Sequence, residues 1–379
     1  MRIGVDCTAA ARQGGGIGRY TRELMRAALA SRPYHDFILM AATAGLGERW
    51  AGEVERLKSL APGRVTARSI PLTDDWMARI WHRLRLPLPA TWITGTIDLF
   101  YAPDFLLPPL PHKVRKVVTI HDLSFLRHPE AFTPQLRDYL ATTVPRSVRR
   151  ADRVLTDSLW TRQDVIELLD VAPDRVTALH LGVSDAFGPD AAPDERHHLE
   201  ATYGLGSEPY VLAVGTVQPR KNYRRLIEAI DRVRERVDAT LVIAGRPAWL
   251  SESIVEAAAS RPHVRLLGFV DDGDLPALYR QAGVFAFPSI YEGFGLPPLE
   301  AMACGTPVVA SSASSIPEAV GAVGLLHDPL DVDGLAQALV RALTDEALRA
   351  DLRRQGLARA AEATWARTAQ EWLAAVQSA

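Results

Sequence analysis

Short apolar runs alternate with stretches of helical periodicity along the first half of the chain. Between the runs, apolar residues three and four positions apart predict amphipathic helices at 17–30 and 134–150. The runs themselves predict strands at 2–6, 37–41, 99–102, 114–120 and 153–156. Strands that alternate with helices in this way indicate a parallel sheet with helices on both faces.

A Pro/Asp/Ala-rich segment at 188–195 interrupts this pattern and is typical of a linker. The alternation then starts again. Strands are predicted at 210–214, 240–244, 264–267, 284–287 and 308–310, and helices from 223 and at 253–259, 275–282 and 296–303. The pattern therefore predicts an α/β protein with two doubly wound, Rossmann-like domains, whose ligands bind beyond the carboxyl ends of the strands.

Composition agrees with a globular chain of two domains. The sequence has 379 residues, of which 47% are hydrophobic and 23% charged. The net charge of −2 combines a mildly basic first half with an acidic second half, and the basic half is compatible with a lipid-phosphate acceptor or an anionic membrane surface. Cys7 and Cys304 form no disulfide framework or zinc spacing, so we expect a reducing cytoplasm. We expect no secretory leader, and we find no 18-residue apolar run that would predict a membrane span.

The most informative motif is the stretch from Glu292 to Glu300, in which two carboxylates flank a glycine-rich turn. The turn follows a predicted strand and precedes a short helix with two prolines in its first turn and Gly305 after its end. Free N–H groups at such a helix start favour phosphate or sugar oxygens. The helix dipole alone would also explain Glu300, but the whole context is more specific than the spacing.

A second glycine-rich turn, Gly14 to Gly18, lies between the first strand and the first long helix. Its glycines allow a close approach of backbone and ligand, and the helix start favours an anion. A dinucleotide-binding fingerprint is the rival interpretation. It is disfavoured because the third glycine is replaced by Thr21.

Basic residues open the helix after the strand at 210–214, in the run from Gly215 to Asn222. Arg220 offers a two-pronged donor and Lys221 a compact charge, and together they could neutralise a leaving diphosphate. A solvated basic face is the alternative. In the first half, His121 and Asp122 end a strand, where a histidine can be a ligand contact or an ordinary polar residue at the sheet edge.

Taken together, these motifs resemble the retaining glycosyltransferases of family 4, which have the two-domain GT-B fold, and within it most nearly the bacterial mannosyltransferase-like group. The resemblance implies that Glu300 holds the ribose and that Glu292 grips the sugar. It implies that Arg220 and Lys221 stabilise the departing diphosphate, and that His121 touches the sugar from the first domain. The remaining implied donor-binding residues are Gly15, Gly16, Gly215, Val270, Ser289, Gly293, Phe294, Gly295 and Leu296.

The resemblance also gives a domain layout. It implies an acceptor-side domain at 1–187, a linker at 188–208 and a nucleotide-sugar-binding domain at 209–359. A C-terminal helix at 360–379 is expected to pack back on the first domain. A tryptophan- and arginine-containing helix at 76–85 leaves two alternatives open, peripheral contact with the inner face of a membrane or a solvated surface.

The implied reaction transfers a sugar from a nucleoside diphosphate sugar to a glycan or lipid-linked acceptor, with retention of anomeric configuration. GDP-mannose is the first choice of donor, followed by UDP-glucose, UDP-GlcNAc and a deoxysugar nucleotide. No metal, cofactor or nucleic-acid partner is expected. A sugar-nucleotide 2-epimerase of the same fold and an NAD-dependent oxidoreductase are the competing classes. The second is disfavoured by the missing glycine, and the first by the context of the two glutamates.

Overall fold

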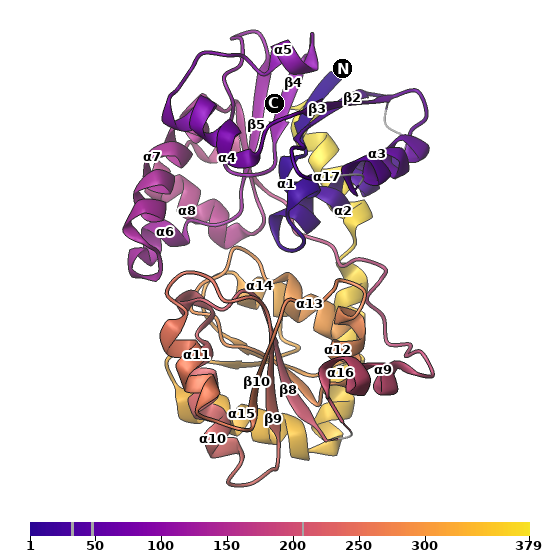
Figure 1. Ribbon diagram of the computed structural model, residues 1–379, viewed down its shortest axis with the longest axis vertical. Coiled ribbons are helices and arrows are strands. Elements are labelled where there is room, and N and C mark those ends of the chain that lie inside the picture. The colour runs from indigo at the N-terminus through magenta and orange to yellow at the C-terminus, as the bar shows by residue number, and fades with distance from the viewer. Residues whose placement is uncertain (32–33, 47–48, 207) are drawn as a thin grey trace. The chain divides into compact units, whose positions relative to one another are not determined.

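The computed structural model describes residues 1–31, 34–46, 49–206 and 208–379. The chain divides into two compact units, each built from more than one stretch of sequence. Unit 1 comprises Met1–Leu123, Asp138–Gly182 and Trp365–Ala379, and unit 2 comprises Ser124–Arg137 and Val183–Thr364. In each unit, helices lie on both sides of a central sheet (Figure 1).

Unit 1 is built on a seven-stranded sheet in the order β3-β2-β1-β4-β5-β6-β7. Every strand pair in it is parallel, which requires a crossover connection between successive strands. Its strands are β1 (Arg2–Asp6), β2 (Asp36–Ala42), β3 (Val65–Ile70), β4 (Leu99–Ala102), β5 (Arg115–Ile120), β6 (Arg153–Thr156) and β7 (Val176–Ala178). Its helices are α1 (Thr8–Arg12), α2 (Ile17–Ala30), α3 (Arg49–Leu60), α4 (Asp74–Ala78), the π-helical turn η1 (Arg79–Arg83), α5 (Thr91–Thr94), α7 (Pro134–Arg150, whose first turn belongs to unit 2), α8 (Leu159–Leu169), η3 (Pro173–Arg175) and α17 (Trp365–Gln377).

Helix α17, from the far end of the sequence, completes the core of unit 1. Its Trp372 is fully buried, with ring centroids 5.2 Å from Tyr101 and 6.4 Å from Phe37. Thr368, one turn earlier, donates a hydrogen bond to the backbone oxygen of His180 at 2.7 Å. The end of the chain is therefore part of the first sheet's packing.

Unit 2 is built on a six-stranded parallel sheet in the order β10-β9-β8-β11-β12-β13. Its strands are β8 (Tyr210–Val214), β9 (Thr240–Ala244), β10 (Val264–Gly268), β11 (Val284–Phe287), β12 (Val308–Ser311) and β13 (Leu325–His327). Its helices are α6 (Ser124–Arg127), η2 (Pro129–Ala131), α9 (Glu195–Tyr203), η4 (Pro219–Lys221), α10 (Tyr223–Val233), α11 (Glu252–Ala259), α12 (Leu275–Gln281), α13 (Leu296–Ala303), α14 (Ile316–Val320), α15 (Val332–Thr344) and α16 (Glu346–Glu362).

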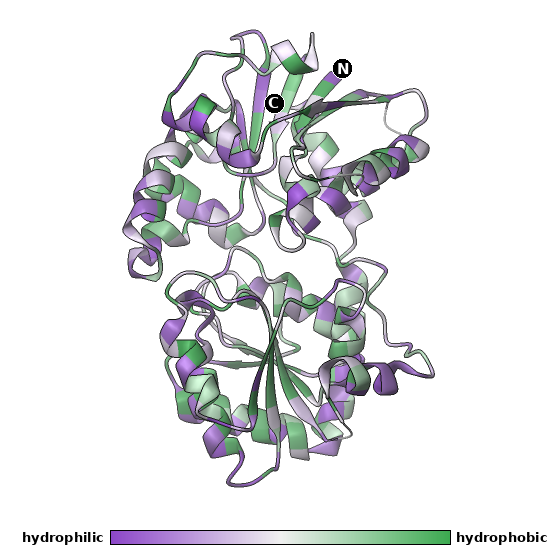
Figure 2. Cartoon of the chain, viewed as in Figure 1, coloured by the Kyte–Doolittle hydropathy of each residue, from purple (hydrophilic) through white to green (hydrophobic). Residues whose placement is uncertain are grey.

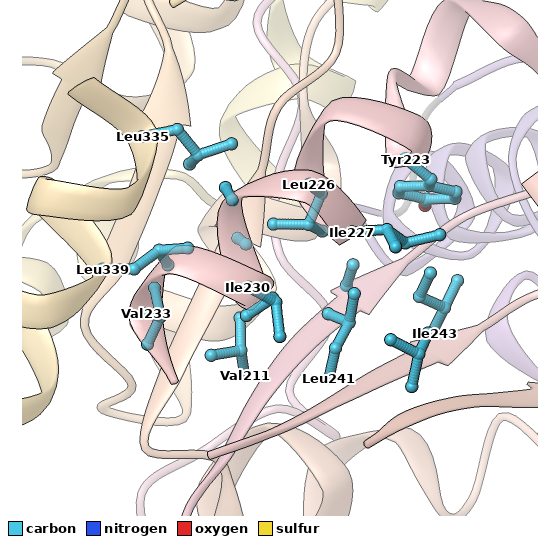
Figure 3. Close-up of a cluster of buried hydrophobic side chains, with 14 of the residues drawn as sticks. Val211, Tyr223, Leu226, Ile227, Ile230, Val233, Leu241, Ile243, Leu335 and Leu339 are labelled. Atoms are coloured by element: carbon cyan, nitrogen blue, oxygen red, sulfur yellow. The ribbon is translucent and has the colours of Figure 1, made fainter. Parts of the chain in front are cut away.

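The strands of unit 2 are mostly apolar, whereas its helices carry both apolar and polar faces (Figure 2). Helix α10 is an example: its Leu226, Ile227 and Ile230 fall on one face and are fully buried. In Figure 3 these side chains pack against Leu241 of β9 and Leu339 of α15. This cluster anchors the start of α10, and so the loop between β8 and α10.

A short segment from the first half of the sequence, Ser124–Arg137, is held in unit 2 by aromatic contacts. Trp249 donates its indole N–H to the backbone oxygen of Ala131 at 2.8 Å and stacks on Phe132 at 5.8 Å. The ring of His128 lies edge-on to Tyr291, 5.7 Å between centroids. The segment thus packs beside the loop that follows β11.

The boundaries of the units differ in three places from the layout expected at 1–187, 188–208, 209–359 and 360–379. Segment 124–137, the stretch from Val183 onward and residues 360–364 all belong to unit 2. The expected linker contains a helix, α9, whose Glu195 binds Arg280 of α12, although residue 207 lies outside the described residues. Within the described ranges, no helix has the length and apolar character needed to cross a membrane.

Candidate functional site

The loops after β8 and β11 are neighbours because these two strands are adjacent in the sheet of unit 2. The strand order runs outward from β8 to β10 in one direction and from β11 to β13 in the other. Such a reversal opens a crevice at the carboxyl ends of the two central strands, where ligands of open α/β sheets bind. Both glutamates and both basic residues of the sequence motifs lie on these two loops and the helices that follow them.

Three charged side chains meet at this position. Glu292 accepts a hydrogen bond from Arg220 at 2.7 Å and from Lys221 at 2.6 Å, one on each carboxylate oxygen. All three side chains are nearly buried, at 13%, 11% and 10% exposure for Arg220, Lys221 and Glu292. Two cations and one anion leave a net charge of +1 at the crevice. We call these three residues the charged triad.

The charges of the triad control its protonation. Burial raises the pKa of Glu292, but Arg220 and Lys221 outweigh burial and bring that pKa from 4.5 to about 2. The carboxylate is therefore ionised at any pH at which the protein is handled. An ionised carboxylate has about four acceptor positions, so Glu292 keeps acceptor capacity for hydroxyl groups while it orients the two cations.

Backbone geometry fixes the loop that carries the two cations. Gly215 has φ +146°, and a Cβ there would lie 3.0 Å from the Tyr223 hydroxyl. Asn222 is left-handed at φ +59° and its amide donates to the backbone oxygens of Pro288 and Pro329. Ile290 donates its N–H to the oxygen of Arg220 at 2.9 Å, which joins the two loops directly. Hydrogen bonds to the loops after β11 and β13 therefore fix the loop that carries Arg220 and Lys221.

The loop after β12 holds Glu292 from the other side. Ser314 accepts the N–H of Glu292 at 2.9 Å, and Ser315 donates to the oxygens of Glu292 and Phe294 at 2.8 and 3.1 Å. The turn then enters α13 through Gly295 at φ +122°, where a Cβ would lie 3.3 Å from the Cβ of Ala319. A side chain at Gly295 would therefore be strained, and glycine is required here.

Helix α13 begins at Leu296 and has prolines at its first turn, as the sequence predicts. Its Glu300 is 3% exposed and accepts a hydrogen bond from the Tyr279 hydroxyl of α12 at 3.0 Å. The stretch from residue 292 to residue 300 therefore begins at Glu292 of the charged triad and ends at Glu300, inside helix α13.

The other expected donor-binding residues of unit 2 lie in loops at the same edge of the sheet. Ser289, after β11, is fully buried, and its hydroxyl contributes to the low pKa of Glu292. Val270, after β10, is buried, while the preceding Phe269 is half-exposed and stacks under the guanidinium of Arg246 at 4.5 Å. Arg246 follows β9, so this pair comes from two adjacent strand ends.

Unit 1 has its own reversal of strand order, between β1 and β4. The glycine-rich turn follows α1, and Gly16, at φ +52°, caps α2. A Cβ at either Gly15 or Gly16 would meet no atom within 4 Å, so the space beside the turn is open. Gln13, before the turn, donates to Asp104 after β4 at 3.4 Å.

His121 lies just beyond β5 and both of its ring nitrogens are engaged within unit 1. Nδ1 is 2.6 Å from Asp157 Oδ2, and Nε2 is 2.7 Å from the backbone oxygen of Pro103. Burial lowers the pKa of His121, but Asp157 and Asp104 outweigh it and bring that pKa to about 9. The ring is also edge-on to Tyr20 at 4.8 Å.

The acidic run at 271–274 is engaged by other side chains. Asp274 accepts from the Tyr203 hydroxyl at 2.6 Å and bonds His198 at 2.9 Å. In the part of the chain that the structure describes, no three His, Cys, Asp or Glu side chains are grouped to hold a metal ion. Independence from metal stays a prediction.

Several residues of these sites carry no assigned role in the sequence analysis. Ser314 and Ser315 hold Glu292, Tyr279 holds Glu300, and Asp157 holds His121. The two serines lie in a small polar run shortly after the strand at 308–310, and Asp157 directly follows the strand at 153–156. The other two pairings depend on which strands and helices become neighbours.

Comparison with known proteins covers both units. The sequence profile described as "Glycosyl transferases group 1" matches residues 199–359, and that described as "Glycosyltransferase Family 4" matches residues 14–187. The chain is 33% identical over 363 residues to the O-antigen chain mannosyltransferase B of Escherichia coli, covering 92% of each. It is 35% identical over 266 residues to the serotype-specific mannosyltransferase WbdA of the same organism, covering 67% of this chain and 32% of WbdA.

Solved structures agree in fold. HepE of Anabaena, solved with UDP and glucose, superposes with a TM-score of 0.74 over the whole of both chains at 19% identity. WaaG, a glycosyltransferase involved in lipopolysaccharide biosynthesis, superposes with a TM-score of 0.71 over both whole chains at 17% identity. The expected pair of Rossmann-like domains is confirmed by these neighbours and by the two parallel sheets.

Proposed function

The chain is a glycosyltransferase of family 4, and on that premise we propose that it transfers mannose from GDP-mannose to an acceptor hydroxyl, with retention of configuration. The acceptor is a growing polysaccharide or lipid-linked glycan. The sugar and acceptor class are taken from the mannosyltransferase relative that matches 92% of the chain, whose name places it in O-antigen synthesis. UDP-glucose, UDP-GlcNAc and a deoxysugar nucleotide are the competing donors.

The charged triad is the observation that carries the reaction type. A nucleoside diphosphate leaves with negative charge, and preorganised cations in a water-poor site stabilise such a charge strongly. Arg220 and Lys221 are held in place before any substrate arrives, because Glu292 binds one hydrogen-bond donor of each. Guanidinium and ammonium groups have further N–H donors for phosphate oxygens.

The donor is proposed to lie along the turn from Glu292 to Glu300. Glu300 would accept from the ribose hydroxyls, and the remaining acceptor positions of Glu292 would accept from the sugar. The N–H groups at Gly293, Phe294, Gly295 and Leu296, at the start of α13, would face the sugar and phosphate oxygens. Val270, Ser289 and Gly215 would contact the base and phosphate ends of the donor. Gly15 and Gly16, in unit 1, are also proposed as donor-binding residues.

Retention is proposed to follow from attack on the face that the diphosphate leaves. The bond from the anomeric carbon to the phosphate oxygen breaks while a bond to the acceptor oxygen forms on that same face. The acceptor proton passes to an oxygen of the departing phosphate. Arg220 and Lys221 hold that phosphate beside the anomeric carbon, so the chain needs no nucleophile of its own.

A panel of nucleotides and nucleotide sugars tests this proposal through thermal stabilisation, with and without EDTA, on wild type and Glu300→Ala. A ligand at about 100 times its dissociation constant adds roughly 2.7 kcal/mol to the folded state. We expect GDP and GDP-mannose to stabilise the wild type in EDTA and to lose their effect in the variant. Stabilisation by NAD(P) alone, or stabilisation by GDP that persists unchanged in Glu300→Ala, would overturn the site.

The reaction itself is followed by NMR with GDP-mannose and an acceptor glycan. Release of GDP together with a new glycosidic signal of unchanged anomeric configuration supports the transferase. A 2-epimerase would instead convert the donor's sugar without any acceptor, so the acceptor-free sample decides between the two classes.

We also propose peripheral contact with an anionic membrane through the stretch 76–92 of unit 1. The expected helix is split into α4 and the π-helical turn η1, and Trp81 is core, with its indole bonded to the Leu88 oxygen at 2.9 Å. Trp76, Leu84 and Trp92 are exposed by 51%, 66% and 74%. Aromatic, leucine and arginine side chains exposed together favour a membrane interface.

Sedimentation with vesicles tests the membrane contact. We expect binding to vesicles containing anionic lipid, weaker binding to zwitterionic ones, and loss of binding in Trp76→Ala/Trp92→Ala. Equal binding by the double variant would refute this surface.

A further inference from the structure

We propose that Arg22 is a positioning residue, which orients the peptide planes of the glycine-rich turn so that the N–H groups of Gly14 and Gly15 face the open side of that turn. Arg22 lies in helix α2, and it would act through the turn without touching a substrate itself. Its expected effect on transfer rests on the proposed function, in which Gly15 and Gly16 bind the donor. Its effect on the turn is a property of unit 1 alone.

The guanidinium of Arg22 gathers three backbone carbonyls at the entry to the turn. Its Nη1 donates to the oxygen of Ala10 at 3.0 Å and to that of Gln13 at 2.6 Å, and its Nη2 donates to the oxygen of Gly14 at 2.5 Å. Ala10 belongs to the end of α1, where carbonyls lack a partner within the helix. The planar fork of arginine suits such a set of acceptors, whereas the ammonium group of lysine is a compact point charge.

Gly18 allows Arg22 to reach these carbonyls. Positions 18 and 22 are four residues apart, so they lie on the same face of α2. A Cβ at Gly18 would lie 2.2 Å from the oxygen of Gln13 and 2.7 Å from that of Ala9, so only glycine lets α2 come this close to the chain before the turn. The start of α2 and the guanidinium therefore hold the entry to the turn from the same side.

The direction of these carbonyls fixes the direction of the N–H groups. In a planar trans peptide, the C=O of one residue and the N–H of the next point in opposite directions. The peptide bonds of the described residues are trans. The oxygens of Gln13 and Gly14 point at Arg22. The N–H groups of Gly14 and Gly15 therefore point away from it.

The far side of the turn is open. Gly15 and Gly16 are exposed, and a Cβ at either would meet no atom within 4 Å. Among the residues that the structure describes, the N–H groups of Gly14 and Gly15 have no hydrogen-bond acceptor. They are thus available to phosphate or sugar oxygens, with the charge of Arg22 behind them. Glycine adopts many backbone conformations, so without Arg22 these peptides would also turn a carbonyl oxygen toward the anionic donor.

¹⁵N relaxation of the full-length protein, labelled at glycine, tests whether Arg22 holds the turn. The signal of Gly15 is assigned with Gly15→Ala, and wild type is compared with Arg22→Met, which keeps the length of the side chain without its donors. We expect an order parameter of about 0.85 for the Gly15 amide in wild type and a value below about 0.6 in Arg22→Met.

Transfer from GDP-mannose tests the positioning role. Misplacement by about 1 Å can cost roughly a hundredfold in rate, so we expect kcat of Arg22→Met to fall about ten- to a hundredfold. Stabilisation by GDP should remain, because the charged triad and Glu300 lie in unit 2. Arg22→Lys restores the charge without the fork, and it should recover only part of the rate.

Arg26→Met is the matched control on the same helix. Arg26 lies one turn after Arg22, and it binds the carboxylates of Glu53 and Glu23 rather than the turn. This variant removes a comparable set of hydrogen bonds from α2. It should keep the wild-type rate and a rigid Gly15.

The remaining outcomes separate this inference from the proposed function. A rigid Gly15 in Arg22→Met would overturn the inference, and so would wild-type transfer in that variant or an equal loss of transfer in Arg26→Met. If Arg22→Met does not fold, Arg22→Lys decides, because full transfer in it would overturn the role of the fork. Absence of nucleotide stabilisation in wild type would overturn the proposed function, while the relaxation data still decide whether Arg22 holds the turn.

Discussion

Replacing Glu292 by glutamine removes the anion from the charged triad while keeping its shape. Two cations then remain nearly buried, and each loses its ionic partner. The pKa of Glu292 falls from 4.5 to about 2 in the folded protein. At 1.36 kcal/mol for each unit of pKa, the ionised carboxylate stabilises unit 2 by about 3 kcal/mol. Mutations that break buried ion pairs cost about 3–5 kcal/mol, which agrees in size.

The pH dependence of this loss has a definite sign. A carboxyl whose pKa is lower in the folded state stabilises that state at pH values above its unfolded pKa, here 4.5. The contribution disappears as the pH falls from 4.5 toward 2. The free energy of unfolding of Glu292→Gln should therefore lie about 3 kcal/mol below that of wild type at pH 7, and the difference should shrink at pH 4 and again at pH 3.

Urea unfolding followed by ¹⁹F NMR of fluorotryptophan measures unit 2 by itself. Of the eight tryptophans in the sequence, Trp249 alone lies in the residue ranges of unit 2. The variant Trp249→Phe assigns its signal. Glu228→Gln is the control, because the Glu228–Arg224 pair is exposed and such pairs contribute within about 1 kcal/mol. A loss below about 1 kcal/mol in Glu292→Gln, or one that is equal at pH 7 and pH 3, would refute the argument from the buried triad.

Two further substitutions test the packing. Gly295→Ala should destabilise unit 2 by about 1–3 kcal/mol and weaken nucleotide binding, because φ +122° and the Ala319 Cβ at 3.3 Å exclude a side chain. Gly15→Ala is the control for stability, because the space around Gly15 is open. Equal stability of the two variants would contradict the geometry. Trp372→Ala should cost unit 1 about 3–5 kcal/mol in the same urea experiment, read from the tryptophan signals of unit 1, since the ring is fully buried against Phe37; an unchanged midpoint would show that α17 does not support that core.

The sequence predicts the central strands well because they are buried on both faces and form continuous apolar runs. Most predicted ends differ by one residue or none, as for β8 and β11. Three strands are missing from the prediction. β3 lies at the sheet edge with most of its residues at least partly exposed, while β7 and β13 have three residues each. Exposure and short length remove the apolar signal on which such predictions depend.

Site residues that lie together in one sequence motif can be predicted from local sequence. Pairings between residues far apart in the sequence cannot be predicted in this way. The spacing from Glu292 to Glu300 predicts helix α13, and the structure has it with the predicted bounds. The bond from Tyr279 to Glu300 and the pairing of Asp157 with His121 join positions 21 and 36 residues apart. They follow from strand order and helix packing, which local periodicity does not specify.

The division of the chain has a consequence for its synthesis on the ribosome. The polypeptide passes from one unit to the other after Leu123, Arg137, Gly182 and Thr364, so neither unit is complete when its first long stretch emerges. Trp372 is made long after Phe37 and Tyr101, whose rings it covers. A nascent chain that stops before residue 365 would leave those rings uncovered. Such a chain would expose apolar surface of the kind that chaperones and proteases recognise.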